Sequence, residues 1–473
     1  MVIFLKINTL LAKAKLPLVK QNHTIQQLSF CSKDCTKNTL FICLKDHPEE
    51  EIIEALKHGV STIVSKPCKT TATNHIFVDS PRKSLAILAK HFYHNSSRKI
   101  RLVGVTGTNG KTTTSTLAYH FFNSIGKKSM LIGSNGIFWE NNEKKINNTT
   151  PDILTIYEAI RIARKKKIHT IFMEVSSISV EQCRIYGLEF DALVLTNFSQ
   201  DHLDYHKTLE QYLFCKLIPF MKLSKKAYAV LNADEDTYAK FSKFTDANVI
   251  TYGIKHPADV LGTYNHSTVH GISFYAKNKL YKSRLVGEFN VYNCLAVLAL
   301  CQVYHISTDK FQDFLAKYSS VAGRMNVIEH KNRFILIDYA HTYSATKKVI
   351  EEAMRLCTGK LTIVLGCGGN REKEKRFMIG DLLNQVEARV ILTTDNPRFE
   401  EPKQIINDIL STIKRPVECI LDRTTAIQNG LDGLKEKDYL LVLGKGCEPY
   451  MDIKGIKYPY SDQEVIYEWI STH

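Results

Sequence analysis

The fold of this chain is decided by the stretch Val103-Gly104-Val105-Thr106-Gly107-Thr108-Asn109-Gly110-Lys111-Thr112-Thr113. The apolar run from Ile100 to Val105 predicts a strand, the closely spaced glycines predict a loop, and Leu117 and Phe121 predict a following helix. Glycines let backbone N–H groups approach phosphate oxygens, a helix N-terminus adds positive potential, and Lys111 brings a full charge. The stretch therefore predicts a loop that binds ATP.

This loop departs from the strict P-loop pattern at one position, because Val105 stands where that pattern has glycine. The alternative is a glycine turn that joins two core elements, but such a turn has no use for Gly-Lys-Thr-Thr directly after a strand. We therefore expect ATP contacts, with the Thr112 hydroxyl placed to ligate Mg²⁺. The expected ATP-binding residues of the loop are Gly107, Thr108, Asn109, Gly110, Lys111, Thr112 and Thr113.

Length and composition describe a chain with several globular domains. The 473 residues suffice for about two to four domains, and 44% hydrophobic with 23% charged residues is typical of domains with real cores. No apolar run approaches the ~18 residues of a membrane span, and lysines interrupt the apolar residues of segment 1–20, which predicts an amphipathic helix and no signal peptide. The twelve cysteines are scattered without a C-x-x-C pair, which predicts reduced thiols in a cytoplasmic chain and no zinc site.

The formal net charge of +15 is compatible with nucleic acid or with acidic small molecules such as nucleotides. The basic residues are spread along the chain, and runs such as Arg164-Lys165-Lys166-Lys167 are short. A solvated helix face explains such a run more simply than a nucleic-acid patch does. We therefore expect no nucleic-acid partner and no membrane partner.

Polar residues follow the predicted strands in two blocks of the chain. From residue 99 onward strands alternate with helices, which predicts an α/β fold with parallel sheets. Glu174 and Asn197 follow strands of the first block, and Asp338 and Arg398 follow strands of the second. Ligands collect beyond the carboxyl ends of parallel strands. The pattern therefore predicts a site between two sheet domains.

In this order the polar clusters resemble the Mur ligase family of ATP-dependent amide synthetases in peptidoglycan precursor assembly. The resemblance rests on Thr106 to Thr113, Thr149-Thr150-Pro151, Met173-Glu174-Val175-Ser176-Ser177, Asp201-His202-Leu203-Asp204-Tyr205-His206, Lys216, Gly287-Glu288-Phe289-Asn290 with Asn293, Gly323-Arg324 and Asp338-Tyr339-Ala340-His341. It covers almost the whole chain. It implies a small N-terminal α/β UDP-binding domain (1–98), a central P-loop ATPase domain with a parallel sheet (99–326), and a C-terminal Rossmann-like, amino-acid-binding domain (327–473). We expect a monomer.

The resemblance also implies a mechanism and the residues that carry it out. The family transfers the ATP γ-phosphate to a carboxylate, and an amine then attacks the acyl phosphate. The implied catalytic residues are Lys111, Glu174, His202 and Lys216. Two Mg²⁺ ions are implied, with Thr112, Glu174, His202 and Lys216 as ligands, the last as a CO₂-derived carbamate.

Further residues match the family's substrate contacts. The implied adenine, ribose and phosphate contacts are Asn290, Asn293, Arg324, Asp338 and His341. Those for UDP-N-acetylmuramoyl-L-alanyl-D-glutamate are Ser32, Asn148, Thr149, Thr150, Ser176, Gln182 and Arg184. The region around Ser32 matches least well, because Cys31 precedes it where the family has an acidic or amide residue.

Two segments indicate which amino acid is added. They are Asp395-Asn396-Pro397-Arg398 and Gly444-Lys445-Gly446 with Glu448, and they resemble the MurE branch of the family. Members that use meso-diaminopimelate carry Asp-Asn-Pro-Arg, and the guanidinium would hold the second carboxylate while repelling lysine. We expect Glu448 to pair with the distal ammonium. The full expected set is Arg371, Asp395, Asn396, Pro397, Arg398, Gly444 and Glu448.

Three alternatives remain open at this stage. One is a paralogue that acts on a modified acceptor or uses L-lysine. Another is a P-loop NTPase that drives motion or senses nucleotide, which predicts ATP hydrolysis without an acceptor. The third is a nucleic-acid-binding NTPase, which predicts a clustered basic face with stacking aromatics. Phosphate release with and without the acceptor and the amino acid distinguishes them.

Overall fold

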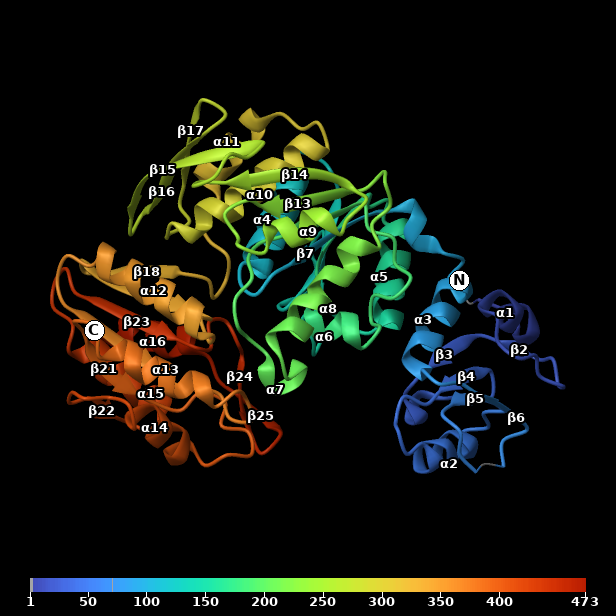
Figure 1. The fold of residues 1–473 in the computed structure, drawn as a ribbon. Helices are drawn as coiled ribbons and strands as arrows, with labels where there is room; N and C mark the ends of the chain where they lie inside the picture. Colours follow the sequence, from blue (N-terminus) through green and yellow to red (C-terminus); the bar gives the residue numbers. More distant parts are fainter. Residues whose placement is uncertain (1–2, 70) are drawn as a thin grey trace.

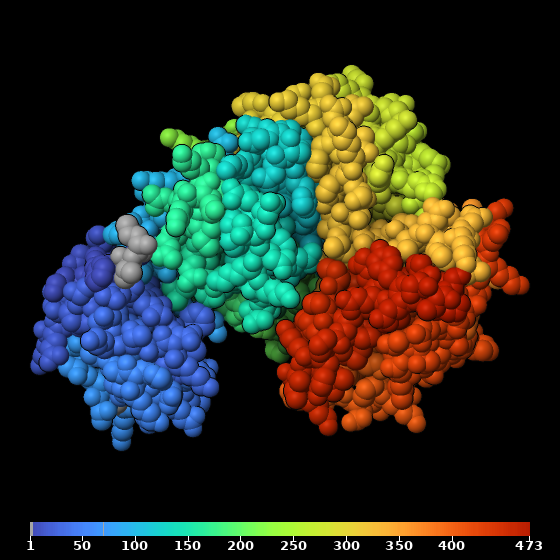
Figure 2. Space-filling model, turned by 180° about the vertical axis from the view of Figure 1, so that it is seen from behind, coloured from blue at the N-terminus to red at the C-terminus, as the bar shows by residue number. Residues whose placement is uncertain are grey.

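A computed structural model describes residues 3–69 and 71–473, and these residues form three parts, each built around its own sheet (Figure 1). Helices pack against the sheet in every part, so the predicted α/β class is confirmed. The N-terminal and C-terminal parts lie on opposite sides of the central part, with a notch between them in the view from behind (Figure 2).

The N-terminal part contains a parallel sheet in the order β3-β4-β5-β6. Its elements are β1 (Leu5–Lys6), α1 (Ile7–Ala14), β2 (Thr24–Ile25), β3 (Gln27–Ser29), β4 (Thr39–Ile42), α2 (Glu49–Lys57), β5 (Thr62–Ser65), β6 (Asn74–Phe77) and α3 (Pro81–Phe92). Helix α1 confirms the predicted amphipathic helix, because Ile7, Leu10 and Leu11 are buried and Lys13 is exposed. Helix α3 leads to the central part, where Tyr93 stacks on Tyr157 at 5.3 Å between ring centroids.

The central part contains an eleven-stranded sheet in the order β10-β9-β8-β11-β7-β12-β13-β14-β15-β16-β17. Its strands are β7 (Arg101–Thr106), β8 (Ser129–Gly133), β9 (Gly136–Trp139), β10 (Asn142–Lys144), β11 (Thr170–Glu174), β12 (Ala192–Leu195), β13 (Tyr228–Asn232), β14 (Asn248–Gly253), β15 (Val260–Thr268), β16 (Gly271–Ala276) and β17 (Lys279–Ser283). Its helices are α4 (Lys111–Ser124), α5 (Ile153–Lys165), α6 (Ser177–Glu181), α7 (Leu203–His206), α8 (Leu209–Met221), α9 (Tyr238–Lys243), α10 (Phe289–Val303) and α11 (Thr308–Lys317).

The central sheet is parallel in its middle, as predicted, and antiparallel at both edges. Strands β8 to β10 and β15 to β17 pair antiparallel, while the strands between them are parallel. Short turns join the edge strands, and a short turn can only reverse the chain, whereas a parallel pair needs a long crossover. The parallel centre is covered on both faces: Phe172 belongs to the core cluster of α4 and α10, and its neighbours Ile171 and Met173 belong to that of α5. The carboxyl ends of β7, β11 and β12 therefore meet at one edge, in front of α4.

The C-terminal part contains a six-stranded sheet in the order β18-β19-β23-β20-β21-β22, parallel except for β18. Its strands are β18 (Asn326–His330), β19 (Arg333–Asp338), β20 (Leu361–Leu365), β21 (Arg389–Leu392), β22 (Glu418–Cys419) and β23 (Tyr439–Leu443), followed by the hairpin β24 (Tyr450–Ile453) and β25 (Ile456–Pro459). Its helices are α12 (Tyr343–Leu356), α13 (Glu374–Leu383), α14 (Pro402–Leu410), α15 (Arg423–Asp432) and α16 (Asp462–Thr472).

Two further observations bear on the sequence-based expectations. All twelve cysteines are free, as the scattered spacing predicted. Within the part of the chain that the structure describes, no helix is both long enough and apolar enough to span a membrane.

Candidate active site

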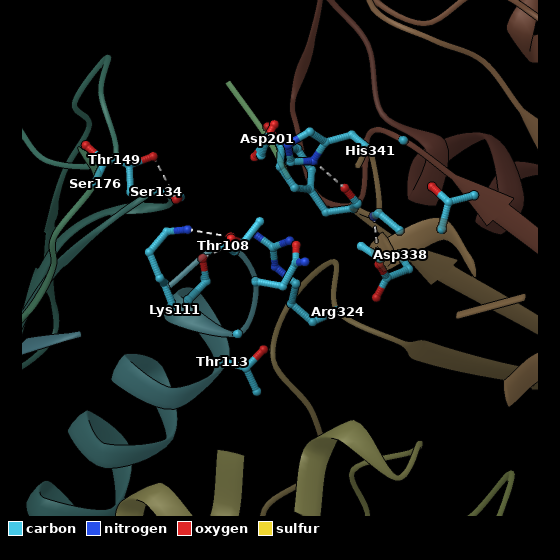
Figure 3. Close-up of a pocket in the computed structure, with 18 of the residues that line it drawn as sticks. Thr108, Lys111, Thr113, Ser134, Thr149, Ser176, Asp201, Arg324, Asp338 and His341 are labelled. Carbon is cyan, nitrogen blue, oxygen red and sulfur yellow. Dashed lines mark hydrogen bonds between the residues drawn. The ribbon is translucent and has the colours of Figure 1, made fainter. Parts of the chain in front are cut away.

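Most of the predicted site residues line one cavity of about 1400 Å³ between the central and C-terminal parts. The loop before α4 forms one wall, the ends of β11 and β12 form another, and the loops after β19, β20, β21 and β23 close the opposite side. Figure 3 shows Lys111 and Thr113 on the central side, with Arg324, Asp338 and His341 on the other. The cavity thus lies between two sheets, where the sequence predicts the site.

The loop before α4 is held in the shape of a phosphate cradle. Gly107 and Gly110 have φ angles of +147° and +81°, which favour glycine. A Cβ at Gly107 would lie 1.9 Å from Thr196 Oγ1, so no larger residue fits this loop geometry. The Lys111 ammonium donates to the carbonyls of Gly107 and Thr108 at 2.8 and 2.7 Å. The loop thus presents a cation and the N-terminus of a fourteen-residue helix to the cavity.

A buried carboxylate lies at the start of α4. Glu174 is 1% exposed, and its Oε2 accepts hydrogen bonds from Thr112 Oγ1 at 2.9 Å and Ser134 Oγ at 3.2 Å. The backbone N–H of Ser134 donates to Oε1 at 2.7 Å, and Arg324 Nη2 donates to Thr112 Oγ1 at 3.1 Å. A hydroxyl and a carboxylate held side by side are the oxygen ligands that Mg²⁺ prefers. The residues present therefore fit a magnesium ion between Thr112 and Glu174.

Lys216 is a buried lysine at the base of this loop. It is 2% exposed, and its Nζ donates to Gly107 O at 2.8 Å, the carbonyl that Lys111 also uses. Burial, and then the charge of Lys111, hold the pKa of Lys216 well below its ordinary value. Lysines are mostly exposed, but the fold places the amine of Lys216 beside the phosphate loop. Once deprotonated, such an amine is a nucleophile, and it becomes a good ligand for Mg²⁺ only when it gains an anionic group.

His202 stands at the same end of the cavity in a left-handed backbone conformation, with φ of +57°. Its Nε2 lies 3.4 Å from Asp201 Oδ2, and burial lowers the pKa of His202 to about 4. The imidazole is therefore neutral at pH 7, the form in which histidine binds metals. His202, a predicted Mg²⁺ ligand, is thus in the protonation state that can bind a metal. Asp201 beside it offers a further carboxylate that the sequence did not single out.

The predicted nucleotide contacts divide into two groups. Arg324, Asp338, His341 and Asn293 line the cavity, whereas Asn290 does not. Asn290 Nδ2 donates to Val286 O at 2.7 Å, and its Oδ1 accepts from Asn293 at 2.8 Å, so Asn290 anchors the start of α10. Its role in this structure is to orient Asn293.

The predicted UDP-sugar-peptide contacts also divide. The residues that line the cavity are Asn148, Thr149, Ser176 and Arg184. Thr150 and Gln182 do not line it and instead support Arg184, because Thr150 O accepts from Nη1 at 2.9 Å and Gln182 Oε1 accepts from Nη2 at 2.6 Å. Ser32 belongs to the N-terminal part, outside the cavity, and its hydroxyl donates to Glu51 Oε2 at 2.5 Å.

On the C-terminal side, Arg371, Asp395, Asn396, Arg398, Gly444 and Glu448 line the cavity, whereas Pro397 does not. Arg398 has φ of +51°, and its Nη1 donates to Gly369 O at 2.7 Å. Asn396 Nδ2 and Lys445 Nζ donate to Glu448 Oε2 at 2.7 and 3.2 Å. Oε2 of Glu448 is therefore already paired with a buried ammonium, that of Lys445. The other oxygen, Oε1, accepts only a longer hydrogen bond, from Tyr339 OH at 3.3 Å.

Some cavity residues lie outside the expected contact sets. Asp234 accepts hydrogen bonds from Tyr292 OH at 2.9 Å and from the backbone N–H of Ile254 at 2.6 Å. The side chains of Asp234 and Tyr292 line the cavity, as does that of Asn293. Asp234 follows strand β13, so the strand-end signal was available for it. Tyr292 lies on a helix of mostly apolar residues and gave no such signal.

Comparison with known proteins agrees with this geometry. Residues 105–301 match the Mur ligase middle domain, and residues 323–446 match the glutamate ligase domain of Mur ligases. A relative from Aquifex aeolicus, named UDP-N-acetylmuramoyl-L-alanyl-D-glutamate–2,6-diaminopimelate ligase, is 37% identical over 94% of this chain and 93% of its own. The enzyme of the same name from Parabacteroides distasonis is 34% identical over 95% of this chain and 96% of its own. A solved structure of an enzyme with that name superposes with a TM-score of 0.70 at 27% identity, covering 99% of both chains. The chain therefore belongs to the Mur ligase family.

Proposed function

We propose that this chain is an ATP-dependent ligase that joins meso-diaminopimelate to UDP-N-acetylmuramoyl-L-alanyl-D-glutamate in cytoplasmic peptidoglycan precursor synthesis. The observation that carries the proposal is that one cavity is lined by the phosphate loop, by Arg184 and by Arg398. Three separate anion-binding positions suit a triphosphate, an acidic acceptor and an amino acid with two carboxylates. The relatives named above carry the same activity in their names.

The first chemical step joins two negatively charged groups. An acceptor carboxylate oxygen attacks the γ-phosphorus, the bond to the bridging oxygen breaks, and ADP leaves. Lys111 and Arg324 offset the repulsion, because both line the cavity around the phosphate loop and neither is fully paired with a carboxylate. The chain thus contributes charge neutralisation and in-line positioning.

Thr112, Glu174 and His202 are the residues that would hold Mg²⁺, which supplies charge neutralisation at the phosphate oxygens when bound. Lys216 would complete a second site as a carbamate. Its neutral amine attacks CO₂, forms an N–C bond and loses a proton, which converts a buried amine into an anion. The lowered pKa of Lys216 supports this assignment, because a protonated amine has no lone pair for the attack.

In the second step the amine of the incoming amino acid attacks the acyl carbon. Phosphate leaves with the bonding electrons, the nitrogen loses a proton, and the amide remains. Arg398 and Arg371 line the C-terminal wall and suit the carboxylates of diaminopimelate. The C-terminal part also closes over the loop, since Ser344 bonds to Asn109 Nδ2 at 3.3 Å and to Ser199 Oγ at 2.9 Å. Tighter closure around bound substrates would keep water from the acyl phosphate.

Phosphate release measured with each substrate omitted tests the proposal. Release should require ATP, Mg²⁺, the UDP-linked dipeptide and meso-diaminopimelate together, and mass spectrometry should show the joined tripeptide. Competition with L-lysine reports the choice of amino acid. Phosphate release without the acceptor, or turnover without an amide product, would contradict the proposal.

A further inference from the structure

Three side chains outside the proposed active site form a compact group. Glu181 ends α6, His206 ends α7, and Cys215 lies in α8. The possible ligand atoms of the three all lie within 4.8 Å of one another. Among residues 3–69 and 71–473, it is the one group of three or more His, Cys, Asp or Glu side chains close enough to share an ion. The ligase chemistry proposed above does not use it.

One distance within this group matches that between two ligands of a metal site. His206 Nδ1 lies 3.3 Å from Glu181 Oε2. Two ligands bound at about 2.0–2.2 Å in a tetrahedral arrangement are separated by about 3.3 Å. The other ring nitrogen, His206 Nε2, lies 2.8 Å from Ser177 Oγ. This hydrogen bond fixes the ring and leaves Nδ1 for an ion, as outer partners do for metal-binding histidines.

Burial and charge also suit an ion. The side chain of His206 is 1% exposed and Cys215 is buried, whereas the side chain of Glu181 is 51% exposed. An ion can therefore enter beside Glu181 and keep water in a fourth position. Burial lowers the pKa of His206, which favours the neutral imidazole that binds metals. One carboxylate and one thiolate balance a divalent charge, which removes the cost of an unpaired charge in a buried place.

We propose that Glu181, His206 and Cys215 bind one divalent cation of the zinc class. A thiolate and an imidazole select a borderline-soft metal over Mg²⁺, so this site differs in chemistry from the phosphate-loop oxygens. Binding replaces the Cys215 S–H bond with a sulfur–metal bond, and the proton passes to solvent. The ion joins α6, α7 and α8, and α8 carries Lys216 as the next residue after Cys215.

Titration with Co²⁺ tests the site, because a cobalt–thiolate bond gives a charge-transfer band that oxygen ligands do not give. The full chain is freed of metal with a chelator and kept in excess Mg²⁺, which occupies oxygen sites. We expect one equivalent of Co²⁺ to produce the band and Zn²⁺ to remove it. Cys215→Ser should lose the band. Cys183→Ser should retain it, since that thiol lies near Glu181 but faces its backbone carbonyl at 3.8 Å.

A second variant covers the possibility that Cys215→Ser does not fold. Glu181→Gln changes an exposed side chain, and losing this ligand should weaken Co²⁺ binding by about tenfold or more. The proposal is overturned if the wild-type chain shows no band, if folded Cys215→Ser shows the wild-type band, or if Glu181→Gln binds Co²⁺ as tightly as wild type.

Discussion

Replacing Arg398 with alanine should weaken the use of meso-diaminopimelate while sparing lysine. In the structure Arg398 Nη1 is held by Gly369 O at 2.7 Å, and Nε lies 3.8 Å from Asp452 Oδ2, beyond hydrogen-bond distance. Nε and Nη2 can therefore turn to a carboxylate in the cavity. Lysine lacks the second carboxylate, so it has no acceptor for Nε and Nη2 of Arg398.

The size of the effect follows from these two donors. A hydrogen bond to a charged group contributes about 1.5–3 kcal/mol, so losing two costs at least about 3 kcal/mol. At about 1.36 kcal/mol for each factor of ten, kcat/KM for meso-diaminopimelate should fall by about 150-fold. The loss should appear mainly in KM, because the carboxylate is held equally before and during amide formation.

Steady-state phosphate release with each amino acid measures the effect. Arg389→Ala is the matched control, because Arg389 pairs with Glu418 at the far edge of the same sheet and does not line the cavity. It should leave both rates within about twofold of wild type. The reasoning fails if Arg398→Ala lowers kcat/KM for both amino acids equally, or if it lowers that for meso-diaminopimelate by less than about threefold.

Lys216→Ala should lower kcat by at least about 100-fold with ATP still bound, measured by phosphate release and nucleotide binding, and full activity would exclude the carbamate. Gly107→Ala should abolish nucleotide binding in calorimetry, since its Cβ would lie 1.9 Å from Thr196 Oγ1, whereas retained binding would show that the loop can relax. The hydrogen bond from buried Arg376 lowers the pKa of Glu400 to about 2. Glu400→Gln should therefore cost about 1–3 kcal/mol of unfolding free energy at pH 7. Because the folded pKa is below the unfolded one, the difference from wild type should shrink from about pH 4.5 toward pH 2 in urea titrations, and a constant difference would contradict the assignment.

The sequence alone determined the α/β class and the phosphate loop, because both depend on local patterns. The strand before Gly107, the glycines with positive φ and the helix that begins at Lys111 are adjacent in the chain. The strand-end rule placed Glu174 and Arg398 at the carboxyl edges of their two sheets for a similar reason, since parallel strands align their carboxyl ends. Residues within such short segments can be assigned without knowing their distant neighbours.

The tertiary structure decided which polar side chains are available. Ser32 bonds to Glu51, Asn290 bonds to Asn293, and Glu448 bonds to Lys445, and the sequence indicated none of these contacts. Each of these contacts depends on how close the folded backbone brings two side chains, and no spacing rule contains that distance.

The same limit explains the group on α6 to α8. Glu181, His206 and Cys215 lie in three different helices, with no metal-ligand spacing between them, and the scattered cysteines had predicted no zinc site. Only the packing of α6 and α7 against α8 brings a carboxylate, an imidazole and a thiol within reach of one ion. Sequence determines which functional groups a helix can present, whereas the packing of helices determines which of them meet.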